Sequence, residues 1–290
     1  MQRTALAAAA AALVATAPAH AIDIDAGDYT ALPAGTKLGI AYAQFAKRDA
    51  LYAGGDRVPI NAGLDSTIGI LRGVYFTEIG GITVDPQFLL PFGKLEAKDD
   101  LEPALGDASG AADLILAATA WLINDAKAGT YFGITPFIYA PTGKYDRNSP
   151  LNLGENRWKF ALQLGYITPL SRSVTLDLAA DATLYGKNDD FGPASQTLKQ
   201  KPLYQAQAWL RYHVSPTLDL RLGLSQVSGG EIRIDGVDQD NRLSTSKVAL
   251  GSGWFVGPTT QLLVTWGRDL SVREGLKENN RVNLRLLQVF

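Results

Sequence analysis

The residues of this chain that could do chemistry are mainly charged side chains set between apolar ones. The chain has 290 residues, with 27 Lys or Arg, 29 Asp or Glu, two His and no Cys. Without Cys there is no disulfide, thiolate metal site or cysteine nucleophile. Acid–base catalysis usually relies on histidine, and after His20 only His213 remains, with no GxSxG elbow, phosphate loop or metal-spaced histidine pair. The sequence therefore argues against an enzyme and predicts no cofactor and no metal site.

The charged residues occupy one parity of alternating stretches. In residues 174–184 the even positions are Val, Leu or Ala, whereas Asp177 and Asp181 occupy odd positions. Alternation over about 9–11 residues is typical of a strand with one apolar and one polar face. The candidate residues of the polar, inward face are Arg157, Lys159, Asp177, Asp181, Arg211, His213, Asp219, Arg221, Lys247, Arg281 and Arg285. His213 is expected to be a structural residue of that surface.

The elements that must position these residues are strands. We expect twelve, at 36–47, 65–77, 81–92, 111–123, 130–141, 158–166, 174–184, 204–214, 218–224, 246–256, 260–266 and 282–290. The short connectors are 80–81, 124–129, 168–171, 215–216 and 257–258, and the long polar ones are 49–63, 93–109, 142–156, 186–202, 228–242 and 270–280. Short and long connectors that alternate predict an all-β fold, a transmembrane antiparallel β-barrel with short periplasmic turns and longer outside loops.

A soluble β-sandwich is the competing fold, because it also buries one face of each strand. Its connectors would not sort by length, however, and the apolar parity here carries almost no charge, as a lipid-facing surface requires. Trp158 and Tyr204 near one end, with Tyr212 and Trp254 near the other, match the aromatic girdles of membrane proteins. Arg72 falls on the outward parity, so we expect a bulge there or a position near a rim.

The two ends of the chain carry export signals. Residues 1–21 combine Arg3, an apolar run and the end Ala19-His20-Ala21, which predicts a cleaved signal peptide and leaves 22–290 as the barrel. An N-terminal core helix is the alternative. The last strand ends in Phe290, which resembles the signal recognised by the barrel assembly machinery. We expect the outer membrane of a Gram-negative bacterium, with its lipid and lipopolysaccharide as surroundings; a net charge of −2 excludes a typical nucleic-acid binder.

Short turns also predict which inward charges meet. Pairing around residues 170–171 places Lys159 opposite Asp181, and pairing around 215–216 places Arg211 opposite Asp219. Such pairs either hold the wall, contributing roughly 0.2–1 kcal/mol each, or form a polar constriction that filters a solute. Because inward Lys and Arg outnumber inward Asp in this set, a slight preference for anions is expected.

Two proline-containing stretches repeat one spacing. Residues 86–94 are PQFLLPFGK and residues 136–144 are PFIYAPTGK, so Pro86 and Pro136, and likewise Pro91 and Pro141, are 50 positions apart. Proline cannot donate to a strand ladder. The favoured interpretation is a bulge or kink that shapes the barrel wall, and the alternative is a seam through which a hydrophobic solute leaves sideways.

Several motifs in one order give a family resemblance. They include VDPQFLLPFG (84–93), TPFIYAPTGKYD (135–146), NLGENRWKF (152–160), LDLAADATLYGKNDD (176–190), QAWLRY (207–212) and WGRDLSV (266–272). From about Asp28 to Phe290 the chain resembles the outer-membrane transporter family named after the meta-pathway of phenol degradation.

The resemblance implies a channel or transporter for passive uptake of small solutes, with aromatic or hydrophobic compounds as candidates. Solute selectivity would come from the inward charges and from loops 93–109 and 186–202. An outer-membrane barrel hydrolase and a purely structural barrel are the alternatives. An autotransporter-type translocator needs a passenger or a helical plug, and only about 14 residues, 22–35, precede the first expected strand.

Overall fold

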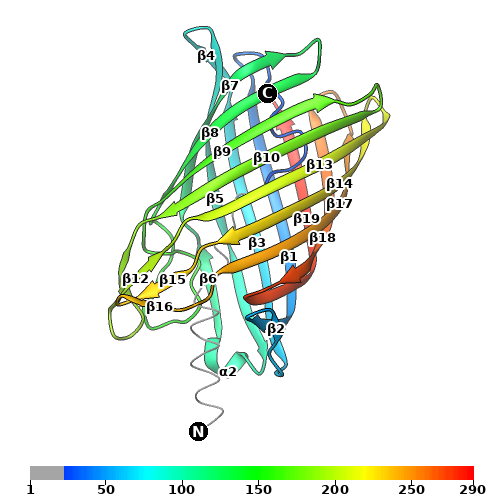
Figure 1. Ribbon diagram of the computed structural model, residues 1–290. Helices are drawn as coiled ribbons and strands as arrows, with labels where there is room; N and C mark the ends of the chain where they lie inside the picture. Colours follow the sequence, from blue (N-terminus) through cyan, green and yellow to red (C-terminus); the bar gives the residue numbers. More distant parts are fainter. Residues whose placement is uncertain (1–22) are drawn as a thin grey trace.

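The last strand pairs with the first and so closes a twelve-stranded antiparallel barrel (Figure 1). The computed structural model describes residues 23–290; the predicted signal peptide, 1–21, lies outside the described residues. The barrel strands are β1 (Lys37–Ala53), β3 (Ala62–Tyr75), β5 (Ile82–Asp99), β7 (Leu114–Asp125), β8 (Thr130–Ala140), β9 (Lys159–Pro169), β10 (Val174–Tyr185), β13 (Leu203–Ser215), β14 (Leu218–Gly229), β17 (Leu243–Phe255), β18 (Thr260–Val272) and β19 (Gly275–Val289). Each neighbours the next in this order.

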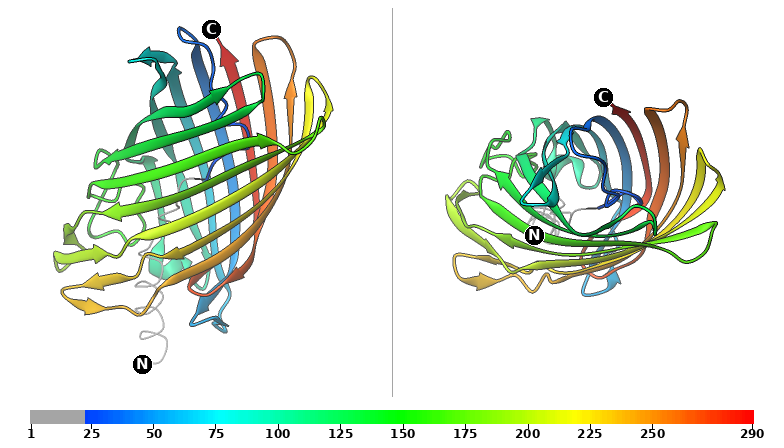
Figure 2. Two further views of the ribbon diagram at one scale, coloured as in Figure 1. Left: turned by 45° about the horizontal axis from the view of Figure 1, so that its top comes forward. Right: turned by 90° about the horizontal axis from the view of Figure 1, so that it is seen from above.

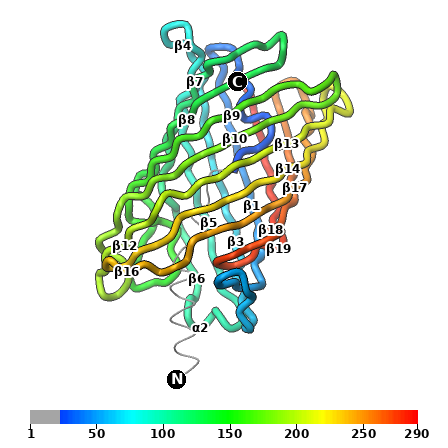
Figure 3. The backbone as a smooth tube through the Cα atoms, viewed as in Figure 1, coloured from blue at the N-terminus to red at the C-terminus, as the bar shows by residue number. Residues whose placement is uncertain are grey.

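Short elements decorate the two ends of the barrel. They are β2 (Asp56–Arg57), β4 (Thr77–Ile79), α2 (Glu102–Leu105), β6 (Asp107–Ala111), β11 (Asn188–Phe191), β12 (Gln196–Gln200), β15 (Ile232–Ile234) and β16 (Val237–Asp238). Strands β11, β12, β15 and β16 form a separate small sheet from two long connectors. The C-terminus and β4 lie at one end, the short-turn end, and α2, β12 and β16 lie at the other, the long-loop end (Figures 1 and 3). In the described part of the chain, no helix is long and apolar enough to span a membrane.

The twelve expected strands are all present, but several extend beyond the expected boundaries. The connector expected at 270–280 is wrong, because β18 continues to Val272 and β19 begins at Gly275. Strand β5 likewise continues to Asp99, through part of the connector expected at 93–109. Apolar–polar alternation is imposed by lipid, whereas backbone pairing continues above the bilayer where both faces are polar. The pattern therefore locates the membrane-facing part of a strand better than its end.

The outward face is apolar, as the alternation predicts. Phe160, Leu162 and Leu164 of β9 are exposed by 40–51% of their surface, while Ala161 and Gln163 between them are buried inside. Trp158 and Tyr204, and at the other end Tyr212 and Trp254, are also exposed. A set of large apolar side chains that faces outward around a barrel is satisfied by lipid rather than by a protein core.

The expectation for Arg72 is wrong. Strand β3 pairs with β1 and β5 without a register shift from Leu64 to Val74, so no bulge is present. Arg72 points inward and donates to Gln87 Oε1 at 2.8 Å and to Tyr42 Oη at 3.1 Å. The prediction assumed that the apolar positions of this strand face lipid. Ile68, Ile70 and Val74 face the interior together with Arg72, so the apolar residues of β3 do not mark the lipid face.

The prolines lie where β7 loses ladder partners. Pro86 faces Ala118 of β7, but the β5–β7 pairing stops at Leu89, before Pro91. On the other side of β7, pairing with β8 is interrupted around Pro136, and Pro141 comes directly after β8. The Thr119 N–H donates instead to the Asp85 carboxylate at 2.7 Å. These positions are consistent with prolines that shape the wall; the sideways exit stays a prediction.

Candidate functional site: the barrel lumen

Residues 23–35, the N-terminal segment, lie inside the barrel before β1 begins (Figure 2). Strands from different sides of the wall hold its backbone. The Gly27 N–H donates to Asp177 Oδ1 at 2.9 Å, Arg221 donates to the Ala26 carbonyl at 2.7 Å, and the Trp121 indole donates to the Tyr29 carbonyl at 2.9 Å. The segment is not a helix, but it occupies the lumen as a plug would.

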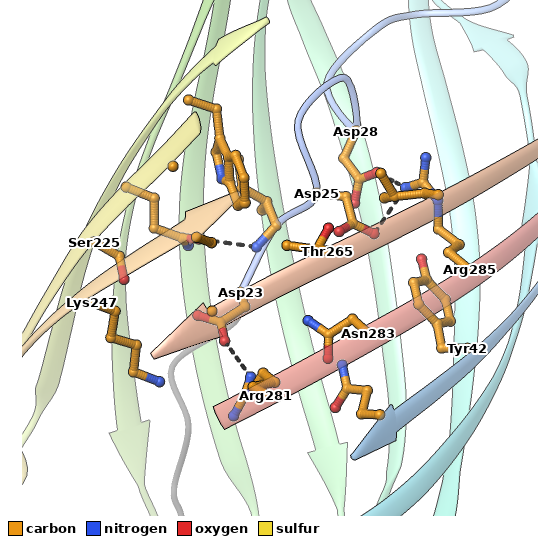
Figure 4. A pocket seen from close by; sticks show the side chains of 18 of the residues that line it. Asp23, Asp25, Asp28, Tyr42, Ser225, Lys247, Thr265, Arg281, Asn283 and Arg285 are labelled. Carbon is orange, nitrogen blue, oxygen red and sulfur yellow. Dashed lines mark hydrogen bonds and ion pairs between the residues drawn. The ribbon is translucent and has the colours of Figure 1, made fainter. Parts of the chain in front are cut away.

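Three aspartates of the N-terminal segment bind arginines of the wall (Figure 4). Asp23 pairs with Arg281 at 2.9 Å, and Arg285 contacts both Asp25 at 3.0 Å and Asp28 at 2.7 Å. Arg72 of β3 adds a further ion pair to Asp28 at 3.2 Å. Sequence reasoning missed these acids, because it considered only the strands; the acidic stretch IDIDAGD before the first strand was the available signal.

The three carboxyls have different proton affinities. Burial disfavours the charge of Asp28, but Arg72 and Arg285 outweigh burial and hold its pKa below the ordinary value. Burial likewise opposes the charge of Asp23, and Lys247 and Arg281 lower its pKa overall. For Asp25, burial dominates and the nearby Asp28 charge adds to it, so its pKa is raised despite Arg285. As pH falls, Asp25 is therefore the first of the three to take up a proton.

Tyr29 of the segment fits a notch made by two glycines. Gly133 of β8 and Gly165 of β9 are register partners. A Cβ on Gly165 would lie 2.1 Å from the Tyr29 ring, and one on Gly133 would lie 2.9 Å from it. The Tyr29 hydroxyl is 2.8 Å from Thr135 Oγ1 and donates to Gln163 Oε1 at 3.1 Å. The glycines thus permit the close approach that seats the plug.

A cavity of about 150 Å³ remains beside the segment. Ser225, Lys247, Thr265 and Asn283 contribute polar groups to it (Figure 4). The apolar part of its lining comes from Ile70, Leu89, Phe137, Trp209 and Leu263, among others. Its lining also includes charged side chains, among them Asp25, Arg72 and Arg285. The cavity therefore combines an apolar part with a charged part, and its volume is about that needed for one small ring.

The two predicted cross-strand pairs are wrong, although all four residues face inward. Lys159 is opposite Tyr185, and Asp181 is opposite Gln163. Across the next turn Arg211 is opposite Arg221, and Asp219 is opposite His213. The turn between β9 and β10 is longer than expected, because the first pair across it is Pro169 with Thr175. Between β13 and β14 a bulge between His213 and Ser215 shifts the pairing. Neither change alters the parity of an inward side chain.

The inward charges find other partners. Arg211 pairs with Asp177 of the neighbouring strand at 2.7 Å, and Arg221 pairs with Asp219 of its own strand. His213 Nε2 lies 2.9 Å from Thr175 Oγ1. That arrangement provides no acid–histidine–nucleophile triad. Lys247 is half-buried and lines the cavity, and Phe290 is 76% exposed at the short-turn end.

Arg157 and Lys159 converge on Glu155, an acid in the connector before β9. The Arg157–Glu155 distance is 2.6 Å, and Lys159 contacts the other carboxylate oxygen. Burial opposes the charge of Glu155, but Lys159 and Arg157 outweigh it and lower its pKa to about 2. The two cations also lie over the rings of Tyr185 and Tyr139, at 4.6 and 4.4 Å. This cluster anchors the connector to the inner wall.

An apolar cluster narrows the lumen at the long-loop end. Leu51, Leu64 and Leu95 of the wall pack with Leu101 and Leu105 around α2 and with Leu151 of the connector after β8. The expected role of loop 93–109 in controlling access is consistent with this packing, whereas loop 186–202 contributes β11 and β12 to the small outer sheet.

The expected anion preference assumed that inward Lys and Arg outnumber inward Asp and Glu, but the structure places further acids in the lumen. The described residues add Asp23, Asp25 and Asp28 from the N-terminal segment, Glu155 from a connector and Glu278 from β19. Each of them pairs with a basic residue. Anion preference stays a prediction, but these acids offset most of the basic excess on which it was based. Within residues 23–290 no three His, Cys, Asp or Glu side chains form a candidate metal cluster.

Comparison with known proteins agrees with this geometry. A family described as "Putative MetA-pathway of phenol degradation" matches residues 47–286. The COG4313 outer membrane channel of Pseudomonas putida F1 is 42% identical, with a TM-score of 0.89, over 92% of this chain and 100% of that one. No curated protein matches.

Two autotransporter barrels show the fold alone. The β domain of Bordetella BrkA has a TM-score of 0.56 at 10% identity, covering 89% of this chain and 100% of that one. The translocator domain of NalP from Neisseria meningitidis has a TM-score of 0.50 at 12% identity, covering 90% and 91%.

A closed barrel with an apolar outer face and a charged lumen defines an outer-membrane channel of a Gram-negative bacterium. The chain belongs to the family of the putative MetA pathway of phenol degradation, as its sequence motifs indicated.

Proposed function

We propose that this channel takes up small monoaromatic compounds with a polar substituent, and that the N-terminal segment keeps its lumen closed at rest. The carrying observation is the cavity of about 150 Å³ between the segment and the wall. Its lining combines apolar side chains such as Leu89 and Leu263 with Ser225, Lys247 and Asn283. Such a lining accepts a ring and a hydrogen-bonding group together.

Uptake would need the segment to move, because it blocks the direct path. The ion pairs of Asp25 and Asp28 with Arg285 are the contacts that must separate. The solute would displace Tyr29 or slip past it on its way to the short-turn end. A passive channel needs no cofactor for this, and neither a catalytic role for His213 nor any other enzymatic activity is part of the proposal.

The test is solute flux through the protein reconstituted in liposomes. Entry of benzoate or phenol should exceed entry of glucose in wild-type vesicles, and deletion of residues 23–35 should raise both fluxes and reduce the discrimination. Equal entry of all three solutes in wild type would contradict the proposal. Lipid hydrolysis lost on His213→Ala would instead favour the barrel hydrolase.

Assembly and surroundings are part of the same proposal. Phe290 directly follows the last strand, β19, and its side chain is exposed, so the barrel assembly machinery could bind it. Lipopolysaccharide would surround the long-loop end. Phe290→Ala should lower the amount of folded protein in the membrane. The amount of folded protein is measured as the fraction whose mobility on a gel changes on heating.

A further inference from the structure

Two aspartates on one face of β10 have very different surroundings. Asp177 is bound by Arg211 Nε at 2.7 Å and by the Gly27 N–H at 2.9 Å. Asp181, four residues later and 6% exposed, has no ion pair among residues 23–290. Its Oδ2 accepts a hydrogen bond from Gln163 Nε2 at 3.3 Å, and its Oδ1 has no partner. A buried carboxyl is normally paired with a basic side chain, bound to a cation or kept neutral by a proton, and no basic side chain among residues 23–290 pairs with Asp181.

Gln205 presents a second free oxygen beside Asp181. The two residues are register partners across β10 and β13. Gln205 Nε2 donates to Asp23 Oδ1 at 2.7 Å. A carboxylate can only accept hydrogen bonds, so this bond fixes the orientation of the Gln205 amide, with its nitrogen toward Asp23 and its oxygen away from Asp23. That oxygen, Oε1, is buried and has no hydrogen-bond donor.

Thr183 adds a third oxygen on the same face. It follows Asp181 by two residues in β10, and side chains two apart lie on one side of a strand. Its Oγ1 is buried without a partner, and the residue is 4% exposed. Side chains of register partners and their diagonal neighbours are close enough to share a ligand. Three oxygens that lack donors therefore face one part of the lumen.

We propose that Asp181 Oδ1, Thr183 Oγ1 and Gln205 Oε1 bind a monovalent hard cation such as Na⁺ or K⁺. Carboxylate, hydroxyl and carbonyl oxygens suit hard cations rather than transition metals. One carboxylate with two neutral oxygens balances a single positive charge. A bound water could donate to two of the oxygens but would leave the charge of Asp181 uncompensated.

The site lies next to the N-terminal segment, since Gln205 joins it to Asp23. A bound cation would hold the Gln205 oxygen and thereby keep the amide oriented toward Asp23. It would also make this part of the lumen electrically neutral. The proposal does not depend on which solute the channel carries.

Anomalous diffraction tests the site directly. Crystals of the mature protein grown in choline chloride and soaked in rubidium chloride should show an anomalous peak in contact with the three oxygens. Asp181→Asn should abolish the peak, and Thr183→Val should weaken it. Thr175→Val is the control matched to Thr183→Val, because it removes a hydroxyl from the same face near the other end of the same strand and should leave the peak. No peak in wild type, or a peak that persists in Asp181→Asn, would overturn the proposal.

A solution measurement gives the second test. Urea unfolding in lipid vesicles is compared in sodium chloride and in choline chloride at equal ionic strength, because choline is too large for the site. At a sodium concentration ten times the dissociation constant, the unfolding equilibrium constant of wild type should be about tenfold lower in sodium. Thr175→Val should keep this ratio, and Asp181→Asn should lose it. A wild-type ratio of one would overturn the proposal and would mean that a proton or a water, not a cation, satisfies Asp181.

Discussion

Two buried arginines of the barrel wall illustrate two uses of an ion pair. Arg48 of β1 contacts Glu278 of β19 at 2.8 Å and Ser66 of β3 at 3.2 Å, so it joins neighbouring strands. Arg285 of β19 contacts Asp25 and Asp28, which belong to no strand. Both guanidinium groups are buried, and Arg285 also donates to Gln261 of the paired strand β18 at 2.7 Å. The ion pair of Arg48 connects two paired strands, whereas both ion pairs of Arg285 go to the N-terminal segment.

The two arginines differ in what loses its attachment when their ion pairs break. Between Asp23 and Thr30 the segment's own backbone–backbone bonds are internal, from the Asp28 N–H to the Asp25 carbonyl and from the Thr30 N–H to the Gly27 carbonyl. Side-chain contacts therefore carry most of its attachment. Breaking the Arg285 pairs removes two of the side-chain contacts of the segment without opening any strand ladder, whereas breaking the Arg48 pair can only weaken the barrel.

Removing the segment gives the largest expected effect. Deletion of residues 23–35, with the export signal kept, should raise single-channel conductance in planar bilayers roughly tenfold or more, because the side chains that fill the lumen are gone. The heat-modifiable mobility of the barrel on a gel should be retained and is the control. An unchanged conductance would mean that the long-loop end, and not the segment, closes the channel.

Separating the two arginines comes next. Removal of one partner of a buried ion pair costs about 3–5 kcal/mol. In Arg285→Ala this cost should appear as more frequent channel opening, and in Arg48→Ala as easier unfolding in urea with no change in opening. Conductance recordings and unfolding midpoints of both variants check the comparison. If Arg48→Ala opened the channel as often as Arg285→Ala, the distinction between wall and segment would be lost.

Filling the tyrosine notch is the third test. Gly165→Ala places a Cβ 2.1 Å from the Tyr29 ring, and overpacking of this kind costs about 1–3 kcal/mol. Part of that cost should displace the segment and increase the open probability. The double variant Gly165→Ala with Tyr29→Gly should relieve the clash, and Gly257→Ala, whose Cβ meets no atom within 4 Å, should have no effect. Equal recordings from Gly165→Ala and wild type would count against the notch.

The smallest expected effect is a pH dependence at the long-loop end. Lys159 and Arg157 lower the pKa of Glu155 to about 2 against burial. Its stabilisation is therefore complete above its ordinary value, near 4.5, and is lost as pH falls toward 2. We expect about 1–2 kcal/mol, because the carboxylate is partly exposed and solvent screens its pairs. Unfolding midpoints in urea at pH 6 and pH 3 should differ more for wild type than for Glu155→Gln.

Much of the barrel was predictable from the alternation of residues. The parity of Asp177, Arg211 and Arg221 was correct because lipid on one side and water on the other select opposite residue types along each strand. The partners of these residues were not predictable, since extra turn residues or a bulge can slip the pairing by an even number of positions, which changes the partners and keeps the parity. Arg72 failed for a different reason, because apolar residues on β3 also face the interior.

The sequence by itself determined the class of protein, the strand number and the lipid-facing surface, because these depend on local alternation and on connector lengths. Only the tertiary structure decided how the lumen is filled. The short polar segment before β1 has no periodic pattern that reveals its position. It lies in the lumen because Gly133 and Gly165 leave room for the Tyr29 ring and because Arg285 pairs with Asp25 and Asp28. Contacts between segments far apart in the chain have no local signature, and they decide where the N-terminal segment lies in the lumen.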